Sequence, residues 1–431
     1  MTEEIRVESL ARVEGHGGIT VTLKDNKVED VRVEIFEGPR LIEALVVGKT
    51  PEEDLNITPR ICAICTVSHK YAALRGLEKA LGVKVPKKTH LTRELMHMGE
   101  IIESNALHVF LLALPDFLGY PSAVHMAKDH LEAVKAGLAL KKFGNRIMEI
   151  TTARATHGEN PVLGGFGRFP SSEELKELKK TAQELIPAAE IGVEIFRGLR
   201  MPTYMEESMV FMALRPPGDE FGFVGDRIMI STGECVDVEE YKSVIEERVV
   251  SHSFAKRARY KGKPFMVGAL ARINLLGERL TGKAGEYYRH CYSLGWMRNP
   301  LYNNLAQAIE ILYCLERIPA LVDEISRLKD PKIAKPEQTS GKGTGAVEAP
   351  RGSLYHHYEI KDGLIQKCDI VTPTAQNLDD MELHVRVGAE VLLSKGHKKD
   401  DDLNLKLEMI VRAYDPCISC ATHLVKVVEK G

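Results

Sequence analysis

The sequence lacks an excess of charge of either sign. Its 58 lysine and arginine residues nearly balance 61 aspartate and glutamate residues, so the formal net charge is -3. Proteins that bind nucleic acid through its phosphates carry a basic surface, which this balance does not provide. Hydrophobic residues make up 44% of the 431 positions and charged residues 28%, as in globular proteins. The composition therefore predicts a folded protein with a large core and without a nucleic-acid partner.

Long apolar runs and an export signal are also missing. The longest apolar run, residues 106–115, is too short to cross a bilayer, and the predicted helix around it carries Arg93, Glu94, Glu100 and Glu103. The first residues, Met-Thr-Glu-Glu-Ile-Arg, have neither the basic start nor the apolar segment of a secretory signal. We therefore expect no direct membrane span and a cytoplasmic location, where cysteines stay reduced.

The eight cysteines do not form a run such as C-x-x-C-x-x-C, which would bind an iron–sulfur cluster. Half of them are scattered singly: Cys235, Cys291, Cys314 and Cys368. The other four form two C-x-x-C pairs, Cys62 with Cys65 near the start of the chain and Cys417 with Cys420 near its end. In a reduced compartment such pairs are typical of metal or redox sites.

The spacing of the two pairs leaves several interpretations open. A structural zinc ribbon places its pairs about 15–20 residues apart, whereas nearly the whole chain separates these two. A thioredoxin-like dithiol needs one pair only, and it leaves the second pair unexplained. Thiolates suit zinc, nickel, copper(I) and iron–sulfur clusters. Spacing alone favours one metal centre shared by both pairs, with separate redox pairs as the second choice.

Apolar periodicity predicts a protein of the α+β class that is mainly α, with a central bundle of long helices and small peripheral β-sheets and hairpins. Helices are expected over residues 69–81, 91–114 (ending at Pro115), 122–148, 171–196 and 304–328, from about 284, and twice before Asp415. Hairpins are expected over 19–37 and over 353–374, where Asp362-Gly363 forms the turn, and short strands over 209–238. Residues 329–345 predict a long surface loop.

The residues around both pairs, Arg60-Ile-Cys-Ala-Ile-Cys and Asp415-Pro-Cys-Ile-Ser-Cys, resemble the two signatures of the nickel–iron hydrogenase large subunit, which is the catalytic one. Three further motifs extend the resemblance along the chain: Arg12-Val-Glu-Gly-His, Ala349-Pro-Arg-Gly and Thr372-Pro-Thr. The related quinone-reducing respiratory subunit shares the fold but lacks the cysteines. The resemblance implies a single large-subunit fold over residues 1–431, in which the N- and C-terminal segments meet at a buried metal site.

The resemblance also implies the ligands of that site. All four paired cysteines, Cys62, Cys65, Cys417 and Cys420, would bind nickel, and Cys65 and Cys420 would in addition bridge to an iron. That iron would carry one carbon monoxide and two cyanide ligands, which other proteins make.

A second metal site, occupied by magnesium or iron, is implied by Glu43, the backbone carbonyl of Ile370 and His423. Two more residues match positions that contact the ligands of the nickel–iron centre. Thr374 would hydrogen-bond a cyanide, and His69 would hydrogen-bond a bridging sulfur. Such contacts orient ligands and tune the metal.

Splitting dihydrogen requires a base close to the metal, and the resemblance assigns that part to Cys417. Arg351 would lie over the open coordination position, and Glu14 would relay the proton, since each transfer requires near contact. A glutamate in a glycine-rich loop or an arginine in an ion pair would otherwise be ordinary surface residues. Three further residues would fix the arginine and its pocket: Pro350, Asp415 and Asp116.

The chain has no further motif for an electron-carrying cluster, so an obligate iron–sulfur small subunit is implied. Segments 37–40, 253–256, 260–269 and 303–308 look most like the soluble cytoplasmic group, which includes sulfhydrogenases and NAD(P)-linked enzymes. Diaphorase or iron–sulfur subunits would then pass electrons to NAD(P), ferredoxin or another soluble acceptor. Residues 424–431 continue past the histidine at which family members are cut. They imply a maturation extension, with a maturation endopeptidase and metal-insertion proteins as partners.

An alternative of another class is a non-catalytic assembly or sensory subunit of the same family, which binds metals without turnover. That alternative predicts lost motif residues, whereas Glu14, Arg351 and the four paired cysteines are all present. A structural zinc protein is less favoured still, and zinc without nickel in the purified protein would restore it.

Overall fold

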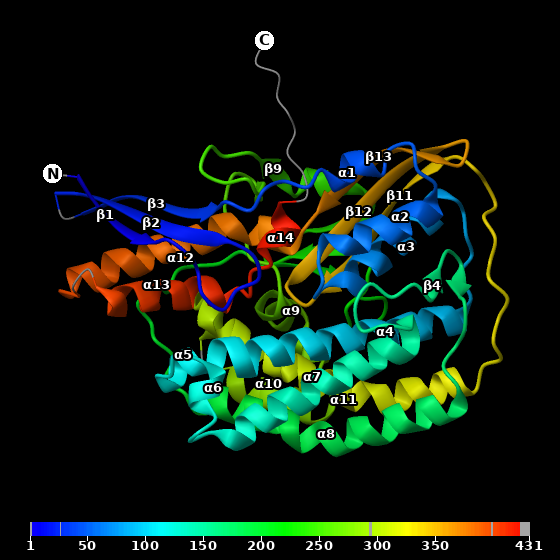
Figure 1. The fold of residues 1–431 in the computed structure, drawn as a ribbon, viewed down its shortest axis with the longest axis horizontal. Coiled ribbons are helices and arrows are strands. Elements are labelled where there is room, and N and C mark those ends of the chain that lie inside the picture. Colours follow the sequence, from blue (N-terminus) through cyan, green and yellow to red (C-terminus); the bar gives the residue numbers. More distant parts are fainter. Residues whose placement is uncertain (1, 26, 293–294, 398–399, 423–431) are drawn as a thin grey trace, which may run out of the picture.

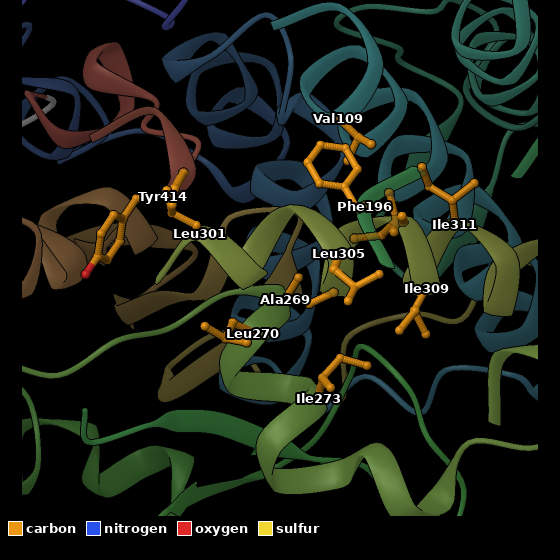
Figure 2. Packing of buried hydrophobic residues seen from close by; sticks show 14 of the residues in the cluster. Val109, Phe196, Ala269, Leu270, Ile273, Leu301, Leu305, Ile309, Ile311 and Tyr414 are labelled. Atoms are coloured by element: carbon orange, nitrogen blue, oxygen red, sulfur yellow. The ribbon is translucent and has the colours of Figure 1, made fainter. Parts of the chain in front are cut away.

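The computed structural model describes residues 2–25, 27–292, 295–397 and 400–422. Long helices form a layer on one side of the molecule (Figure 1). They are α4 (Lys87–Ala106), α7 (Leu131–Thr152), α8 (Ser172–Gly198) and α11 (Asn303–Ser326), joined by α9 (Ala269–Leu276) and α10 (Gly282–Cys291). In the core, Leu305 and Ile309 of α11 lie close to Ile273 of α9 (Figure 2). The predicted helical bundle is therefore confirmed.

Two predicted helix boundaries are wrong. The helix that begins at Lys87 does not end at Pro115, because it continues through a wide π-type turn, Leu107–Ala113, into α5 (Leu114–Leu118). Pro115 lies in the first turn of α5, a position where the missing N–H is tolerated. The helix predicted over 122–148 is divided into α6 (Ala123–Met126) and α7.

The helix over Lys87–Leu118 is long and apolar enough to cross a membrane, and it is the one such helix in the described part of the chain. However, 67% of its most apolar window is buried inside the protein. It therefore has the character of a core helix, as expected from its charged residues.

An N-terminal antiparallel sheet lies against the C-terminal helices (Figure 1). Its strands, in the order β1-β2-β3, are β1 (Thr2–Val7), β2 (Gly17–Lys24) and β3 (Lys27–Ile35). The predicted hairpin corresponds to β2 and β3, and β1 was not predicted. Helices α12 (Pro373–Ser394) and α13 (Asp401–Ala413) pack on this sheet, so the N-terminal strands and these late helices are neighbours.

A second antiparallel sheet carries the late motifs. It comprises β11 (Gly341–Ala349), β12 (Gly352–Lys361) and β13 (Leu364–Val371), and the turn between the last two lies at Asp362-Gly363, as predicted. On it lie α1 (Ile42–Leu45), α2 (Pro51–Ile57) and α3 (Thr66–Ala80) (Figure 1). The loop predicted over 329–345 is wrong at its end, because β11 begins at Gly341. Glycines at alternate positions concealed this strand, since glycine is depleted in strands.

The remaining described elements are short. Strands β6 (Met212–Arg215), β7 (Arg227–Ile230) and β8 (Cys235–Asp237) confirm the predicted strands between the helical segments. Two small ladders pair β4 (Pro161–Val162) with β5 (Gly165–Phe166), and β9 (Glu246–Arg248) with β10 (Arg257–Arg259). Helix α14 (Ile418–Ala421) follows α13 and lies between the two larger sheets (Figure 1).

Two glycines allow helix α3 to lie directly on β11 and β12. A Cβ atom at Gly345 would be 2.0 Å from the carbonyl oxygen of Ala72 in α3, and one at Gly76 would be 2.7 Å from the carbonyl oxygen of His356. Only glycine permits backbones to approach so closely. The contact fixes α3, whose N-cap is Cys65, over the strand pair whose turn carries Arg351.

We predict that Gly345→Ala destabilises the fold, because the new methyl group meets backbone that cannot rotate away. Overpacking of this kind costs about 1–3 kcal/mol, and urea denaturation followed by circular dichroism measures it. The matched control is Gly198→Ala, since a Cβ atom at Gly198 meets nothing within 4 Å. Equal unfolding midpoints for the two variants would show that α3 is not held by this contact.

Candidate metal centre

The four paired cysteines converge, although nearly the whole chain separates the two pairs. Cys62 follows the short helix Thr58–Ile61, Cys65 is the N-cap of α3, and Cys417 and Cys420 lie at the start and inside of α14. The sulfur of Cys62 is 3.2 Å from that of Cys417, Cys65 is 3.1 Å from Cys420, and Cys417 is 2.9 Å from Cys420. All four side chains are buried, and their sulfurs lie within 4.8 Å of one another.

These sulfurs fit a single soft cation. Their contacts are longer than a disulfide bond of about 2.05 Å, and all four cysteines are free thiols. Around one ion with metal–sulfur bonds of about 2.3 Å, ligands at right angles lie about 3.3 Å apart, and tetrahedral ligands about 3.8 Å apart. The observed contacts are nearer to the right-angled case, which nickel(II) accepts, whereas structural zinc sites are tetrahedral.

Ionisation of Cys417 and Cys420 depends on such a cation. Burial raises the pKa of Cys417 to about 11, and it raises that of Cys420 well above its ordinary range. Without a cation these two side chains are neutral at physiological pH, and a bound metal replaces their protons.

Arg40 bridges the two cysteine segments. Its Nη2 atom donates to the carbonyl of Ile61 at 2.6 Å and to the carbonyl of Ser419 at 2.5 Å, and its backbone N–H donates to the carbonyl of Thr422 at 3.1 Å. Ile61 precedes Cys62 and Ser419 precedes Cys420. One half-buried guanidinium therefore sets the distance between the two pairs, a role that the sequence did not reveal.

Glu14 lies directly against the centre. The thiol of Cys417 donates to its Oε2 atom at 3.1 Å, the backbone N–H of Ser419 donates to the same oxygen at 3.0 Å, and the hydroxyl of Ser419 donates to Oε1 at 2.5 Å. The backbones of residues 14 and 417 also form a parallel bridge. Glu14 is half-buried, so its carboxylate connects a buried sulfur with the outside. Ser419 was missed from the sequence; its place between the paired cysteines was the available signal.

Arg351 enters the centre from the turn between β11 and β12. Its Nε atom donates to the carbonyl oxygen of Asp415 at 2.7 Å, Nη2 donates to the Asp415 carboxylate at 3.0 Å, and Nη1 donates to the hydroxyl of Ser104 at 3.3 Å. Asp415 has a left-handed backbone with φ of 50°, an uncommon conformation for a residue other than glycine. Both the backbone and the side chain of Asp415 thereby reach the same guanidinium.

The comparisons with known proteins agree with this geometry. A family model described as nickel-dependent hydrogenase matches residues 40–151 and 233–423, and a HoxL-like model matches residues 4–37. This chain belongs to the nickel-dependent hydrogenase family. It is 43% identical over 425 residues to the sulfhydrogenase 1 subunit alpha of Pyrococcus furiosus, with 98% of each chain covered.

Two further relatives support the assignment to this hydrogenase family. The NAD-reducing hydrogenase HoxS subunit beta of Cupriavidus necator is 29% identical, with 98% of this chain and 95% of the relative covered. A crystal structure of an NAD⁺-reducing [NiFe]-hydrogenase in the H₂-reduced state superposes with a TM-score of 0.91 at 30% identity, covering 98% of this chain and 99% of the other. The predicted resemblance and the mainly α fold are confirmed.

In this hydrogenase a second buried arginine holds the turn that carries Arg351. Arg272 of α9 binds Glu310 through Nε at 2.5 Å and Glu348 through Nη1 at 2.8 Å, and its Nη atoms donate to the carbonyls of Ala349 and Pro350 at 3.0 Å each. Pro350 thus contributes its carbonyl to the position of the turn. No local pattern marked Arg272, because its partners are 38 and 76 residues away.

The contacts of Asp116 differ from the expected position beside Arg351. Its carboxylate pairs with Arg12 and with Arg412, the latter at 2.7 Å. Arg12 belongs to the loop that carries Glu14, so Asp116 anchors that loop. Within the described part of the hydrogenase no contact joins Asp116 to Arg351, and its predicted role beside the arginine stays a prediction.

The other predicted site residues lie around the sulfurs. The backbone N–H of Cys417 donates to Thr374 Oγ1 at 2.9 Å, and Thr374 lines a small internal cavity together with Arg351, Cys65 and Cys420. Glu43 is buried and accepts from the backbone N–H of Ile370 at 2.8 Å, so two of the three residues expected at the second metal site are adjacent. The third, His423, lies outside the described residues. The ligand roles of all these residues stay predictions.

We predict that Arg272→Met costs about 3–5 kcal/mol of folding free energy, because it leaves two buried carboxylates without their cation. Chemical denaturation of the purified subunit measures the loss. The control is Arg146→Met, since Arg146 and its partner Glu177 are both exposed and such pairs contribute less than about 1 kcal/mol. A loss for Arg272→Met no larger than that of the control would contradict the assigned role.

Proposed function

We propose that this chain is the catalytic subunit of a nickel–iron hydrogenase that reversibly splits dihydrogen into protons and electrons. The observation that carries the proposal is the convergence of four buried cysteine sulfurs with a carboxylate, Glu14, in contact with one of them. A sulfur site alone would fit several metals. A sulfur site with a base beside it and a fixed guanidinium facing it fits the heterolytic cleavage of a small neutral molecule.

The four cysteines would hold nickel, and Cys65 and Cys420 would also bind iron. A small cavity lined by Thr374 and Arg351 lies beside these two side chains, and we place the proposed iron on this side of the sulfurs. We propose carbon monoxide and two cyanides as those ligands, in keeping with the resemblance. When bound, the metal pair supplies the polarisation of dihydrogen and the uptake of its electrons.

Residues of the protein would accept and transfer the proton. Cys417 lies within hydrogen-bond distance of Glu14, and its thiolate would take the proton and pass it to the carboxylate, a transfer that requires contact of this kind. Ser419 donates two hydrogen bonds to Glu14 and keeps both oxygens directed at the centre. Because Glu14 is half-buried, the proton can then leave towards the surface.

Arg351 would orient the substrate. Its guanidinium is held by Asp415 and Ser104, so its charge faces the sulfurs in one orientation without reorganisation. Asp415 and Pro350 would act by positioning this arginine. Asp116 would act through the neighbouring loop.

A second metal, magnesium or iron, would bind to Glu43, the carbonyl of Ile370 and His423. Oxygen ligands favour Mg²⁺, and the histidine makes iron an acceptable occupant.

We further propose that residues 1–431 form a single large-subunit fold. Residues 424–431 would be the maturation extension, removed by an endopeptidase after metal-insertion proteins have loaded the site.

The proposed partners are an obligate iron–sulfur small subunit and further electron-transfer subunits. The names of the relatives support this, since they are subunits alpha and beta of sulfhydrogenase and NAD-reducing hydrogenase. Electrons would pass to NAD(P), ferredoxin or another soluble acceptor. We propose a soluble cytoplasmic complex.

The test of this function is metal analysis of the purified complex together with hydrogen-dependent reduction of NAD(P)⁺ or a viologen dye. We expect nickel together with a larger amount of iron, because the iron–sulfur partner adds its own iron, as well as infrared bands of carbon monoxide and cyanide and hydrogen-dependent turnover. The matched variant is Arg351→Lys, which should keep the metals and lose most turnover, because lysine cannot make the three contacts of the guanidinium. Zinc without nickel, or normal turnover of the variant, would contradict the respective assignments.

We predict that Glu14→Gln lowers turnover by about 10²–10⁴-fold with unchanged nickel content, since an amide of the same shape cannot carry the proton. Exchange of hydrogen with deuterium from solvent should fall in parallel. Glu37→Gln is the control, because among the described residues the Glu37 carboxylate hydrogen-bonds only to His16. Unimpaired exchange in Glu14→Gln would exclude this route.

A further inference from the structure

A chain of buried hydrogen-bonding side chains leads away from Cys420, whereas the proposed proton relay begins at Cys417. His69 Nε2 is 3.7 Å from the Cys420 sulfur, and His69 Nδ1 is 3.0 Å from His356 Nε2. His356 Nδ1 is 3.0 Å from the hydroxyl oxygen of Tyr358, which is 2.9 Å from Asp54 Oδ2. His69, His356, Tyr358 and Asp54 are each at most 1% exposed.

The fold fixes the order of these side chains. His356 and Tyr358 are two residues apart on β12, so they face the same side of the sheet. His69 comes from α3 and Asp54 from α2, and both helices lie on that sheet. The chain therefore connects a cysteine near the C-terminus with a carboxyl group that is eight residues before the first cysteine pair.

Counting hydrogens shows that the chain needs one more than its neutral side chains supply. There are four contacts, and each requires one hydrogen between its two heavy atoms. If Cys420 binds metal as a thiolate, the two neutral imidazoles and the tyrosine contribute three hydrogens. The carboxyl group of Asp54 can supply the fourth. Every donor then points towards the sulfur, from Asp54 to Tyr358, His356, His69 and Cys420 in turn.

Ionised Asp54 would reverse this order. The tyrosine would donate to the carboxylate, each imidazole would donate towards Asp54, and the Nε2 lone pair of His69 would face the thiolate. The contact to Cys420 would then lack a hydrogen. The direction of four hydrogen bonds thus depends on one proton at the far end of the chain.

The surroundings of Asp54 favour its protonated form. Its Oδ1 atom is buried without a hydrogen-bond partner, which is costly for a carboxylate. Burial raises the pKa of Asp54 to about 7, although the hydroxyls of Tyr358 and Thr58 and the charge of Lys70 act in the opposite direction. Lys70 directs its ammonium to the carbonyl of Leu55, and burial lowers the pKa of Lys70 to about 8. From β13, the buried Cys368 also faces Asp54, and it is neutral because burial raises its thiol pKa.

We propose that Asp54, Tyr358 and His356 are positioning residues that hold His69 with its Nε2 hydrogen directed at the Cys420 sulfur, with the Asp54 carboxyl proton completing the chain. The inference rests on the proposed function, in which Cys420 is a metal ligand. A hydrogen bond to a metal-bound sulfur withdraws charge from it and tunes the metal. The electronic state of the centre therefore responds to ionisation of a residue that touches neither metal nor ligand.

The experiment is a pH titration of the nickel electron paramagnetic resonance spectrum of the purified complex. In the unmodified enzyme we expect one shift of the spectrum, centred on about pH 7. Asp54→Asn should keep the low-pH spectrum at every pH, because the asparagine NH₂ group always donates to Tyr358. Tyr358→Phe should also abolish the shift, since it disconnects Asp54 from His356.

The matched control is Tyr204→Phe, which removes a buried hydroxyl that donates to the carbonyl of Lys406 at 2.9 Å. It should retain the shift of the unmodified enzyme. If Asp54→Asn does not incorporate nickel, Tyr358→Phe carries the test. A shift that persists in Asp54→Asn or in Tyr358→Phe, or a high-pH spectrum in Asp54→Asn, would overturn the inference, as would a pH-independent unmodified enzyme. Absence of nickel from the unmodified enzyme would instead overturn the proposed function.

Discussion

The metal centre depends on a single constraint: two segments from opposite ends of the chain must be held together without a covalent bond between them. Arg40 meets that constraint directly, because its guanidinium binds one carbonyl from each cysteine segment. A planar cation with several donors can bridge two backbones in fixed geometry, which a lysine cannot do. The parallel bridge between residues 14 and 417 joins the relay loop to the same assembly. Hydrogen bonds to the backbone of both segments thus hold the four sulfurs near one another.

Buried arginines fix other segments around the centre in the same way. Arg351 is fixed by Asp415, the turn that carries Arg351 is fixed by Arg272, and the loop that carries Glu14 is fixed by Asp116 and Arg12. Buried ion pairs contribute little net stability, since desolvation offsets much of their attraction. Here each buried ion pair fixes a backbone segment that carries a site residue. We infer that these buried charges serve to position the site residues.

Local patterns predicted the helices, the two hairpins and the cysteine pairs, because each of these features depends on neighbours within a few residues. The strand that begins at Gly341 was not predicted because of its glycines. These glycines allow α3 to pack closely on the strand, and no local pattern shows that contact. Arg40, Arg272 and Asp54 were likewise missed. Their partners lie far along the chain, up to 379 residues away for Arg40 and 304 for Asp54, and such pairings exist only after folding. The motifs could indicate the reacting residues, but the residues that position them required the fold.

The two sides of the sulfur cluster have opposite characters. Cys417 contacts a half-buried carboxylate in a loop, where a proton can be exchanged with the surroundings. Cys420 contacts His69, at one end of a buried hydrogen-bonded chain whose other end is Asp54. In the proposed function, a sulfur that gains and loses a proton needs a carboxylate in contact with it, whereas a sulfur that bridges two metals needs a hydrogen bond that adjusts its charge. The fold supplies the first through an N-terminal loop and the second through a sheet covered by helices. In the proposed function, this asymmetry would let one cluster of four similar ligands separate proton transfer from the tuning of the metals.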